Sequence, residues 1–498
     1  MKVLILLLLV TAVVKGQYDL NMAYGRSTMV HLFEWSWDDI ANECENFLAP
    51  YDYGGVQVSP PSEHYLSPDN VWWDRYQPVS YKLDCKKGDE TAFKNMVTRC
   101  NNVGVRIYVD AVINHMAAGG CKYLTTSSGG SSYDAGAYSF PAVPYSSWDF
   151  NVPNGYCPSS NGGVNDYGNA EEVRNCNLLG LTDLSMGNSY VQDKIVEYLN
   201  NLISMGVAGF RVDAVKHMWP DHLKSIYDRL DNLDSSVFGF GKRPFFVQEV
   251  IDMGHGEPIT AGEYTHIGRV TEFKYSDKIG TVALGYDQMK WLHNFGEDWG
   301  FMSRDYALVF VDNHDNQRNH GGGGNIVTHT SSKQYKIAST FMLGYDYGVT
   351  RVMSSFFFSD NDYGGPSNSP YFTSDGACNV NSGWVCEHRW REIRNMVGFR
   401  KTCDGQGVNN WWDNGNNMIA FSRGSKGFIA INGDSYQMSE WLQTGMPAGT
   451  YCDVISGDKS GNSCTGNAIT VYSDGEAYFE ISNSSDSPII AIHANSKL

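Results

Sequence analysis

Eight short segments rich in β-branched and aromatic residues alternate with helical patterns between residues 28 and 354. This alternation limits the possible folds more than any other feature, because strands joined by helical crossovers pair in parallel. The expected strands are residues 28–33, 54–58, 105–109, 208–212, 244–248, 266–270, 307–311 and 350–354. Eight such repeats predict an α/β fold of the closed (β/α)8, or TIM-type, barrel class.

The helical patterns between these segments repeat apolar residues every three or four positions. Residues 37–48 and 190–206 show this period most clearly, and Gly206 ends the second helix directly before the strand at 208–212. The sequence therefore predicts helices that cover the outside of the barrel.

Two stretches depart from the alternation. Residues 114–185, after the third strand, are rich in Gly, Ser, Asn and Tyr, which predicts an inserted irregular subdomain rather than one long loop. Residues 407–498 show hairpin signals and no helical pattern, which predicts a C-terminal antiparallel β-sandwich domain. The barrel is then expected to comprise residues 17–113 and 186–406.

The first sixteen residues carry a lysine, an apolar run and a small residue before Gln17, the pattern of a cleaved secretory signal. The apolar run is too short to span a membrane, and no later segment is long enough. Loss of Lys2 and Lys15 changes the formal charge from −18 to −20. So acidic a secreted chain is expected to bind neither nucleic acid nor an anionic membrane.

Eleven cysteines in an exported chain predict several disulfides and one thiol left over. The closest spacings favour Cys378 with Cys386, Cys452 with Cys464, and Cys157 with Cys176. No pair has the CxxC spacing of a zinc site, so these cysteines are interpreted as structural.

Polar residues gather where four of the predicted strands end. They are Asp110, Asn114 and His115; Arg211, Asp213, Lys216 and His217; Glu249; and Asn313, His314 and Asp315. The loops at the carboxyl ends of barrel strands carry function in this fold. Arg211 and Asp213 could be a structural ion pair, but carboxylates on several separate strands match the needs of glycoside cleavage, in which one attacks and one donates a proton.

Four stretches, DAVINH, GFRVDAVKH, FVQEV and FVDNHD, resemble the four short motifs of the α-amylases in their order and spacing. HLFEWSW near residue 31 and WWDRYQPVSYKL at 72–83 are similar to the animal, chloride-dependent branch of that family. The resemblance covers essentially the whole chain after residue 16.

The resemblance implies a role for each carboxylate. Asp213 matches the family's nucleophile, Glu249 its general acid/base, and Asp315 the third carboxylate, which orients the substrate. Arg211 on the same strand face favours the ionised form of Asp213.

Two ions are also implied. Arg211, Asn313 and Arg351 match the family's chloride site, where an anion near Glu249 would raise its pKa. The calcium site matches the side chains of Asn114 and Asp183 and the backbone carbonyls of Arg174 and His217.

The resemblance further implies a set of substrate-binding residues. They are Trp72, Trp73, Tyr76, Gln77, His115, Lys216, His314 and His320. The glycine-rich run at 319–325 is similar to the family's flexible loop at the cleft edge. Cys44 is expected to pair with Cys100 and Cys85 with Cys121, leaving Cys403 as a buried free thiol.

Together these features predict a secreted, digestive and monomeric enzyme that hydrolyses internal α-1,4 bonds of starch, glycogen and malto-oligosaccharides with retention of configuration. Two alternatives stay open. A transglycosylase would pass the same intermediate to a sugar instead of water, and a noncatalytic glucan-binding homologue would keep the fold without the chemistry.

Overall fold

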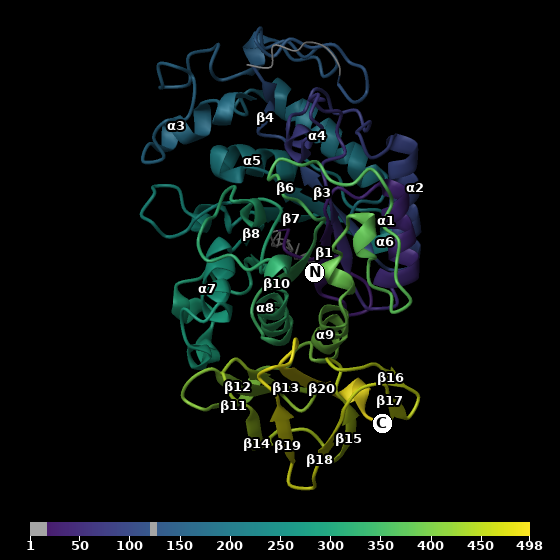
Figure 1. Ribbon diagram of the computed structural model, residues 1–498. Helices are drawn as coiled ribbons and strands as arrows, with labels where there is room; N and C mark the ends of the chain where they lie inside the picture. Colours follow the sequence, from purple (N-terminus) through teal and green to yellow (C-terminus); the bar gives the residue numbers. More distant parts are fainter. Residues whose placement is uncertain (1–16, 120–126) are drawn as a thin grey trace, which may run out of the picture.

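A closed barrel of parallel strands forms the centre of the molecule in the computed structural model, which describes residues 17–119 and 127–498 (Figure 1). In order around the barrel the strands are β1 (Thr28–Leu32), β2 (Gly55–Val58), β3 (Arg106–Ala111), β6 (Gly209–Val212), β7 (Phe245–Gln248), β8 (Arg269–Thr271), β9 (Ala307–Val309) and β10 (Val349–Ser354). β10 pairs back onto β1 and closes the ring. The predicted barrel is confirmed.

Each predicted strand overlaps an observed one, and the largest difference concerns β8. The prediction placed this strand at 266–270, whereas it begins only at Arg269. The residues before it belong to a turn that follows a 3-10 helix (Ala261–Tyr264), because the backbone N–H of Ile267 donates to the carbonyl of Tyr264 at 3.2 Å. The apolar residue Ile267 therefore lies in a turn and not in a strand.

Helices surround the barrel as the apolar periodicity predicted. They are α1 (Trp37–Glu43), α2 (Glu90–Asn102), α4 (Ser189–Ser204), α5 (Pro220–Asp228), α6 (Ser235–Phe238), α7 (Phe273–Ala283), α8 (Ser332–Gly344) and α9 (Arg391–Thr402). The side chain of Asn188 caps α4 by accepting from Tyr190 N–H, and Gly206 follows its end with a positive φ of 97°. The helix predicted at 37–48 is α1 continued by a π-helix (Cys44–Leu48).

Between β3 and α4 the chain leaves the barrel. It forms an antiparallel pair, β4 (His115–Ala118) with β5 (Leu181–Asp183), and the short helix α3 (Ala170–Asn175). In Figure 1 α3 and β4 lie in the upper part of the molecule, at the opposite end from the C-terminal strands.

The C-terminal part is an antiparallel all-β domain, as predicted. Its strands are β11 (Val408–Asp413), β12 (Met418–Arg423), β13 (Gly427–Asn432), β14 (Met438–Gln443), β15 (Gly449–Cys452), β16 (Lys459–Ser460), β17 (Ser463–Cys464), β18 (Ala468–Val471), β19 (Glu476–Ile481) and β20 (Ile489–His493). The sheet β11-β12-β13-β20 and the pair β14-β19 enclose an apolar core that includes Met418, Phe428 and Phe479.

Four predicted disulfides are present. They join Cys44 to Cys100, Cys157 to Cys176, Cys378 to Cys386, and Cys452 to Cys464. The expected partner of Cys85, Cys121, lies outside the described residues, as does the predicted signal at 1–16. Cys403 is buried and forms no disulfide with any cysteine that the structure describes.

Helices long and apolar enough to cross a membrane are absent from residues 17–119 and 127–498.

Candidate active site

Three carboxylates from neighbouring barrel strands contact one guanidinium group. Nη1 of Arg211 lies 2.6 Å from Asp110 Oδ1 and 2.6 Å from Asp213 Oδ1, while its Nη2 contacts Glu249. Asp110 lies on β3, Arg211 on β6, Asp213 directly after β6 and Glu249 directly after β7. The register pairs Asp110 with Arg211, so strand pairing itself brings these charges together.

The turn after β6 holds Glu249 from a second side. Ala214 has a left-handed backbone, with φ of 52° and ψ of 34°, which is costly for a residue with a Cβ atom. Its backbone N–H donates to Glu249 Oε2 at 2.9 Å. Both oxygens of Glu249 are therefore fixed in position, one by Arg211 and one by this backbone group.

Asp315 joins the cluster from the loop after β9. The side chain of Asn313 shapes that loop by accepting hydrogen bonds from the backbone N–H groups of Asp315 (3.1 Å) and Asn316 (2.7 Å). Asp315 Oδ2 lies 3.4 Å from Nε2 of His314. The structure thus brings together the three carboxylates that the sequence singled out, and Asp110 with them.

Burial dominates the electrostatics of this cluster. It raises the pKa of Asp213 well above its usual range; the Arg211 guanidinium opposes this shift, and the nearby carboxylates of Glu249, Asp110 and Asp315 reinforce it. Burial, followed by the charge of Glu249, raises the pKa of Asp315 to about 7. Asp213 and Asp315 therefore bind protons more strongly than the same carboxylates would in water.

A second buried guanidinium lies below the cluster. Arg351, on β10, donates to Oε1 of Gln57 at 2.7 Å, and its pKa is lowered to about 10 by burial and then by the positive charge of Arg211. Asn313 is buried as well. Arg351 and Arg211 are thus two buried cations that repel each other, and a small anion held near both would offset that repulsion.

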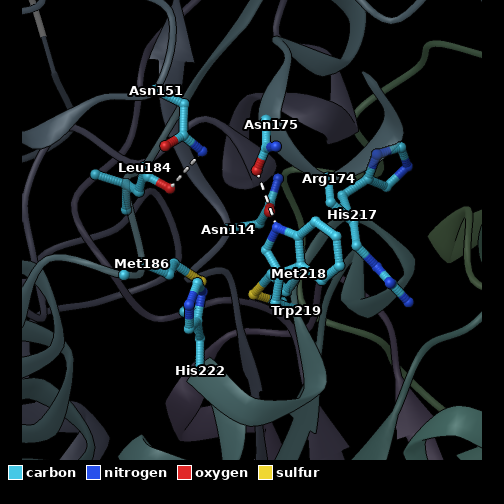
Figure 2. Close-up of a pocket in the computed structure, with 11 residues that line it drawn as sticks. Asn114, Asn151, Arg174, Asn175, Leu184, Met186, His217, Met218, Trp219 and His222 are labelled. Atoms are coloured by element: carbon cyan, nitrogen blue, oxygen red, sulfur yellow. Dashed lines mark hydrogen bonds between the residues drawn. The ribbon is translucent and has the colours of Figure 1, made fainter. Parts of the chain in front are cut away.

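Three of the four expected calcium residues line a cavity between the inserted segment and the barrel (Figure 2). Asn114, Arg174 and His217 line it. Next to these residues, Oδ2 of Asp183 accepts from Asn151 at 2.7 Å, but its buried Oδ1 has no hydrogen-bond partner among the described residues.

Metal-binding clusters of three or more His, Cys, Asp or Glu side chains do not occur in the part of the chain that the structure describes. A cation at this cavity would need amide and carbonyl oxygens in addition to Asp183. Such an oxygen set fits Ca²⁺, which takes six to eight oxygen ligands.

Aromatic rings form one wall beside the carboxylates. The ring of Tyr76 stacks on His314 at 5.2 Å, and Trp72 meets His314 edge-on at 5.5 Å. The hydroxyl of Tyr76 donates to Asp110 Oδ2 at 2.8 Å, and its backbone carbonyl lies 2.9 Å from Nε2 of His115. Exposed His320 extends this wall, with its ring 5.7 Å from that of Trp72.

The other expected binding residues differ in their contacts and burial. Lys216 lines a cavity with Glu249 and donates to the carbonyl of Ile251 at 2.9 Å. Trp73 is partly buried against the core. The side-chain oxygen of Gln77 accepts from the backbone N–H of Ala118 at 3.0 Å, which ties the aromatic loop to β4.

Sequence reasoning missed three residues of the site. Gln57 bonds Arg351, and Asn151 bonds Asp183. His31 is fully buried, is influenced by the charge of Arg351, and has no hydrogen-bond partner at either ring nitrogen within the described residues. Gln57 and His31 lie inside predicted strands, where a polar residue in an apolar run was the available signal.

A (β/α)8 barrel with carboxylates gathered at the carboxyl ends of its strands is an arrangement typical of glycoside hydrolases. Residues 72–248 match the family model described as α-amylase, catalytic domain, and residues 409–495 match the α-amylase C-terminal all-beta domain. The chain belongs to the α-amylase family.

Similar proteins cover nearly the whole chain. It is 55% identical to human α-amylase 1B and 54% identical to pig pancreatic α-amylase, in each case over 97% of both chains. Among solved structures, wild-type α-amylase I from Eisenia fetida is 47% identical, with a TM-score of 0.89 over 96% of this chain and 99% of the other. A variant of that enzyme in complex with maltohexaose gives a TM-score of 0.90 at 48% identity and the same coverage.

Proposed function

We propose that this protein is an endo-acting α-1,4-glucan hydrolase that cleaves starch, glycogen and malto-oligosaccharides with retention of configuration. The observation that carries the proposal is the contact of Asp213 and Glu249 with two nitrogens of the same guanidinium, Arg211. A planar guanidinium holds both carboxylates close enough to act on one sugar linkage.

In this proposal Asp213 attacks the anomeric carbon while the carboxyl group of Glu249 protonates the leaving glycosidic oxygen. The bond to the leaving sugar breaks as a bond to Asp213 forms, and Glu249 then takes a proton from the water that releases the glycosyl group. Asp315 binds the sugar and supports the positive charge of the transition state. The wall formed by Trp72, Tyr76 and His314 packs against the sugar rings.

Trp73, Gln77, His115, Lys216 and His320 complete the proposed substrate-binding set. Lys216 lines a cavity with Glu249, and His320 lies against Trp72, which supports substrate contacts beyond the carboxylates themselves. The maltohexaose complex of the Eisenia fetida relative agrees with a glucan ligand.

Chloride is proposed at Arg211, Asn313 and Arg351. The fit rests on two buried cations whose mutual repulsion an anion would offset. A chloride there would supply negative charge that offsets the positive charge of Arg211 beside Glu249.

Calcium is proposed at Asn114, Asp183 and the carbonyls of Arg174 and His217. The fit rests on the unpartnered buried oxygen of Asp183 beside the cavity. The ion supplies no chemistry to the sugar; it would join the inserted segment to the barrel and hold the cleft in shape.

The acidic charge, the signal pattern at residues 1–16 and the disulfides support export of the protein, and we propose that it acts as a secreted, digestive monomer. The pancreatic relatives agree with this assignment.

Incubation with soluble starch tests the main proposal. The expected products are maltose-sized fragments, and proton NMR of the first products should show the α-anomer before mutarotation. β-Anomeric first products would contradict retention. Longer, redistributed chains would favour the transglycosylase, and an absence of product would favour a noncatalytic protein.

Exhaustive dialysis against a chloride-free buffer tests the anion site separately. The activity should fall in chloride-free buffer and return when chloride is added. Arg351→Gln should remove the response to chloride. Full activity without chloride would contradict this assignment and leave the hydrolase proposal intact.

A further inference from the structure

Three aromatic side chains lie together on the outer surface of the C-terminal domain. Trp441 on β14 faces Tyr478 on β19, with 5.5 Å between the ring centroids, and Tyr472, just after β18, lies 5.6 Å from Trp441. Trp441 is 55% exposed, Tyr472 52% and Tyr478 41%. We call these three residues the aromatic face.

The core of the domain does not need this face. In the β14-β19 pair, Met438, Leu442, Ala477, Phe479 and Ile481 are buried in the apolar core. The outer side consists of the cross-strand pairs Ser439–Glu480, Trp441–Tyr478 and Gln443–Glu476. The strands thus hold the rings on a fixed backbone with their outer side toward solvent.

The rings are exposed and do not cover one another face to face. Trp441 is tilted by 50° to Tyr472 and by 47° to Tyr478. The flat side of an aromatic ring is electron-rich and attracts polarised C–H groups. One side of a sugar ring presents such C–H groups. Clustered exposed aromatic area of this kind marks a binding surface.

The polar residues around the aromatic face favour a neutral ligand that is rich in hydroxyl groups. Glu476 and Glu480 flank the rings and accept hydrogen bonds from hydroxyl groups. Strands β14 and β19 contain no Lys or Arg. Carboxylates without cations repel nucleic acid and anionic membranes, whereas a glucan chain carries no charge to be repelled.

We propose that Trp441, Tyr472 and Tyr478 form a second binding surface for α-glucan chains and hold the protein on insoluble starch while the barrel cleaves. The inference rests on the proposed function, which supplies the polymer. Because the same polymer reaches both sites, binding at one raises the effective concentration at the other.

Binding to raw starch granules in the cold tests the proposal, with the full chain carrying Asp213→Asn so that the granules are not digested. Adding Trp441→Ala and Tyr478→Ala should weaken retention on the granules about tenfold, the factor that corresponds to about 1.4 kcal/mol. Trp441→Tyr, which keeps a ring, should restore most of the binding. The matched control is Trp291→Ala, at a tryptophan with 47% exposure whose nearest ring contact is the amine of Lys290.

Activity measured without Asp213→Asn separates this surface from the cleft. The double variant should cleave maltoheptaose within about twofold of the unmodified rate and raw starch several-fold more slowly, since only the granule assay needs a second contact. Thermal unfolding of each variant reports loss of the cross-strand aromatic pair, which contributes about 0.2–1 kcal/mol.

Four results would overturn the inference. The first is that the double variant is retained on granules as well as the unmodified protein, and the second is that Trp291→Ala loses as much retention as the double variant. The third is binding to cellulose as strong as binding to starch. The fourth is a dimer in gel filtration that dissociates in the double variant. The last would assign the aromatic face to a second copy of the chain. Failure to cleave maltoheptaose would instead count against the hydrolase proposal, since granule binding is measured without catalysis.

Discussion

The mouth of the barrel and the interior of the C-terminal domain are both buried, but they are built from opposite materials. Asp110, Arg211, Asp213 and Glu249 meet at the mouth with little access to solvent, whereas the β domain packs residues such as Phe428 and Phe479 around an apolar core. Buried charges are costly to desolvate, while buried apolar area stabilises a fold. The comparison indicates that the buried charges at the barrel mouth serve catalysis at a cost in folding stability. The apolar core of the β domain contributes stability and takes no part in catalysis.

The strongest test of this division is Asp213→Asn. Removal of the proposed nucleophile should lower kcat/KM on starch by about 10,000-fold or more, as for other covalent catalysts. The melting temperature should stay the same or rise, because three carboxylates crowd around one guanidinium and Arg211 keeps Asp110 and Glu249 as partners. Reducing-sugar assays and calorimetry measure the two effects.

The matched control is Asp453→Asn in the β domain. Asp453 is also a buried aspartate, whose Oδ1 accepts from the backbone N–H groups of Ala491 (3.0 Å) and Ile455 (3.1 Å). This variant should lower stability and leave kcat/KM unchanged. Loss of activity in a folded Asp453→Asn protein would break the proposed separation of the two regions.

Phe479→Ala tests the other side of the comparison. The fully buried ring lies in the core of the β domain, and its truncation should cost about 3–5 kcal/mol of unfolding free energy. At a temperature where the variant remains folded, kcat/KM should stay within about twofold of the unmodified value, since the site is on another domain. Denaturant unfolding followed by circular dichroism measures the loss, and exposed Tyr478→Ala should cost less than about 1 kcal/mol.

Calcium removal probes the junction between the inserted segment and the barrel. Chelation should lower the unfolding free energy by about 2.7 kcal/mol when the starting ion concentration is 100 times Kd. Asp183→Asn should be less stable in calcium and respond little to the chelator. A chelator effect of the same size in both proteins would place the ion elsewhere.

The smallest expected effect is a shift with pH. The pKa of Asp315 is raised from 3.8 to about 7, so its protonated form stabilises the folded state below pH 3.8, and this contribution is lost as the pH rises through about 7. Activity should change in the opposite direction, because Asp213 must be ionised to attack and its pKa is also raised.

Asp315→Asn checks both trends. The melting temperature should decrease less between pH 5 and pH 8 in this variant than in the unmodified protein, because the titrating group is gone. The acid limb of the residual kcat/KM profile should move to lower pH, because one negative charge near Asp213 is removed. An unchanged acid limb would show that the two carboxylates are not coupled.

The barrel and the position of its carboxylates could be predicted because both depend on local strand patterns in the sequence. A residue at the carboxyl end of a parallel strand reaches the mouth of the barrel wherever the helices lie, which is why Asp213 and Glu249 could be placed in advance. Gln57 and Asn151 could not, since each acts through one partner far along the chain, and such partners depend on register and loop path. The shifted start of β8 has the same cause, as a turn contact with Tyr264 outweighed a local preference.

Closure of the ring by β1 and β10 has a consequence for biosynthesis. Thr28 of β1 pairs with Thr350 of β10. More than 300 residues must therefore be translated after β1 before β10 is available to pair with it. Until then the nascent chain exposes two unpaired strand edges, which are sites of wrong association. A ribosome that pauses before residue 349 would present β1 with only one of its two neighbours, so chaperone demand should peak in that interval.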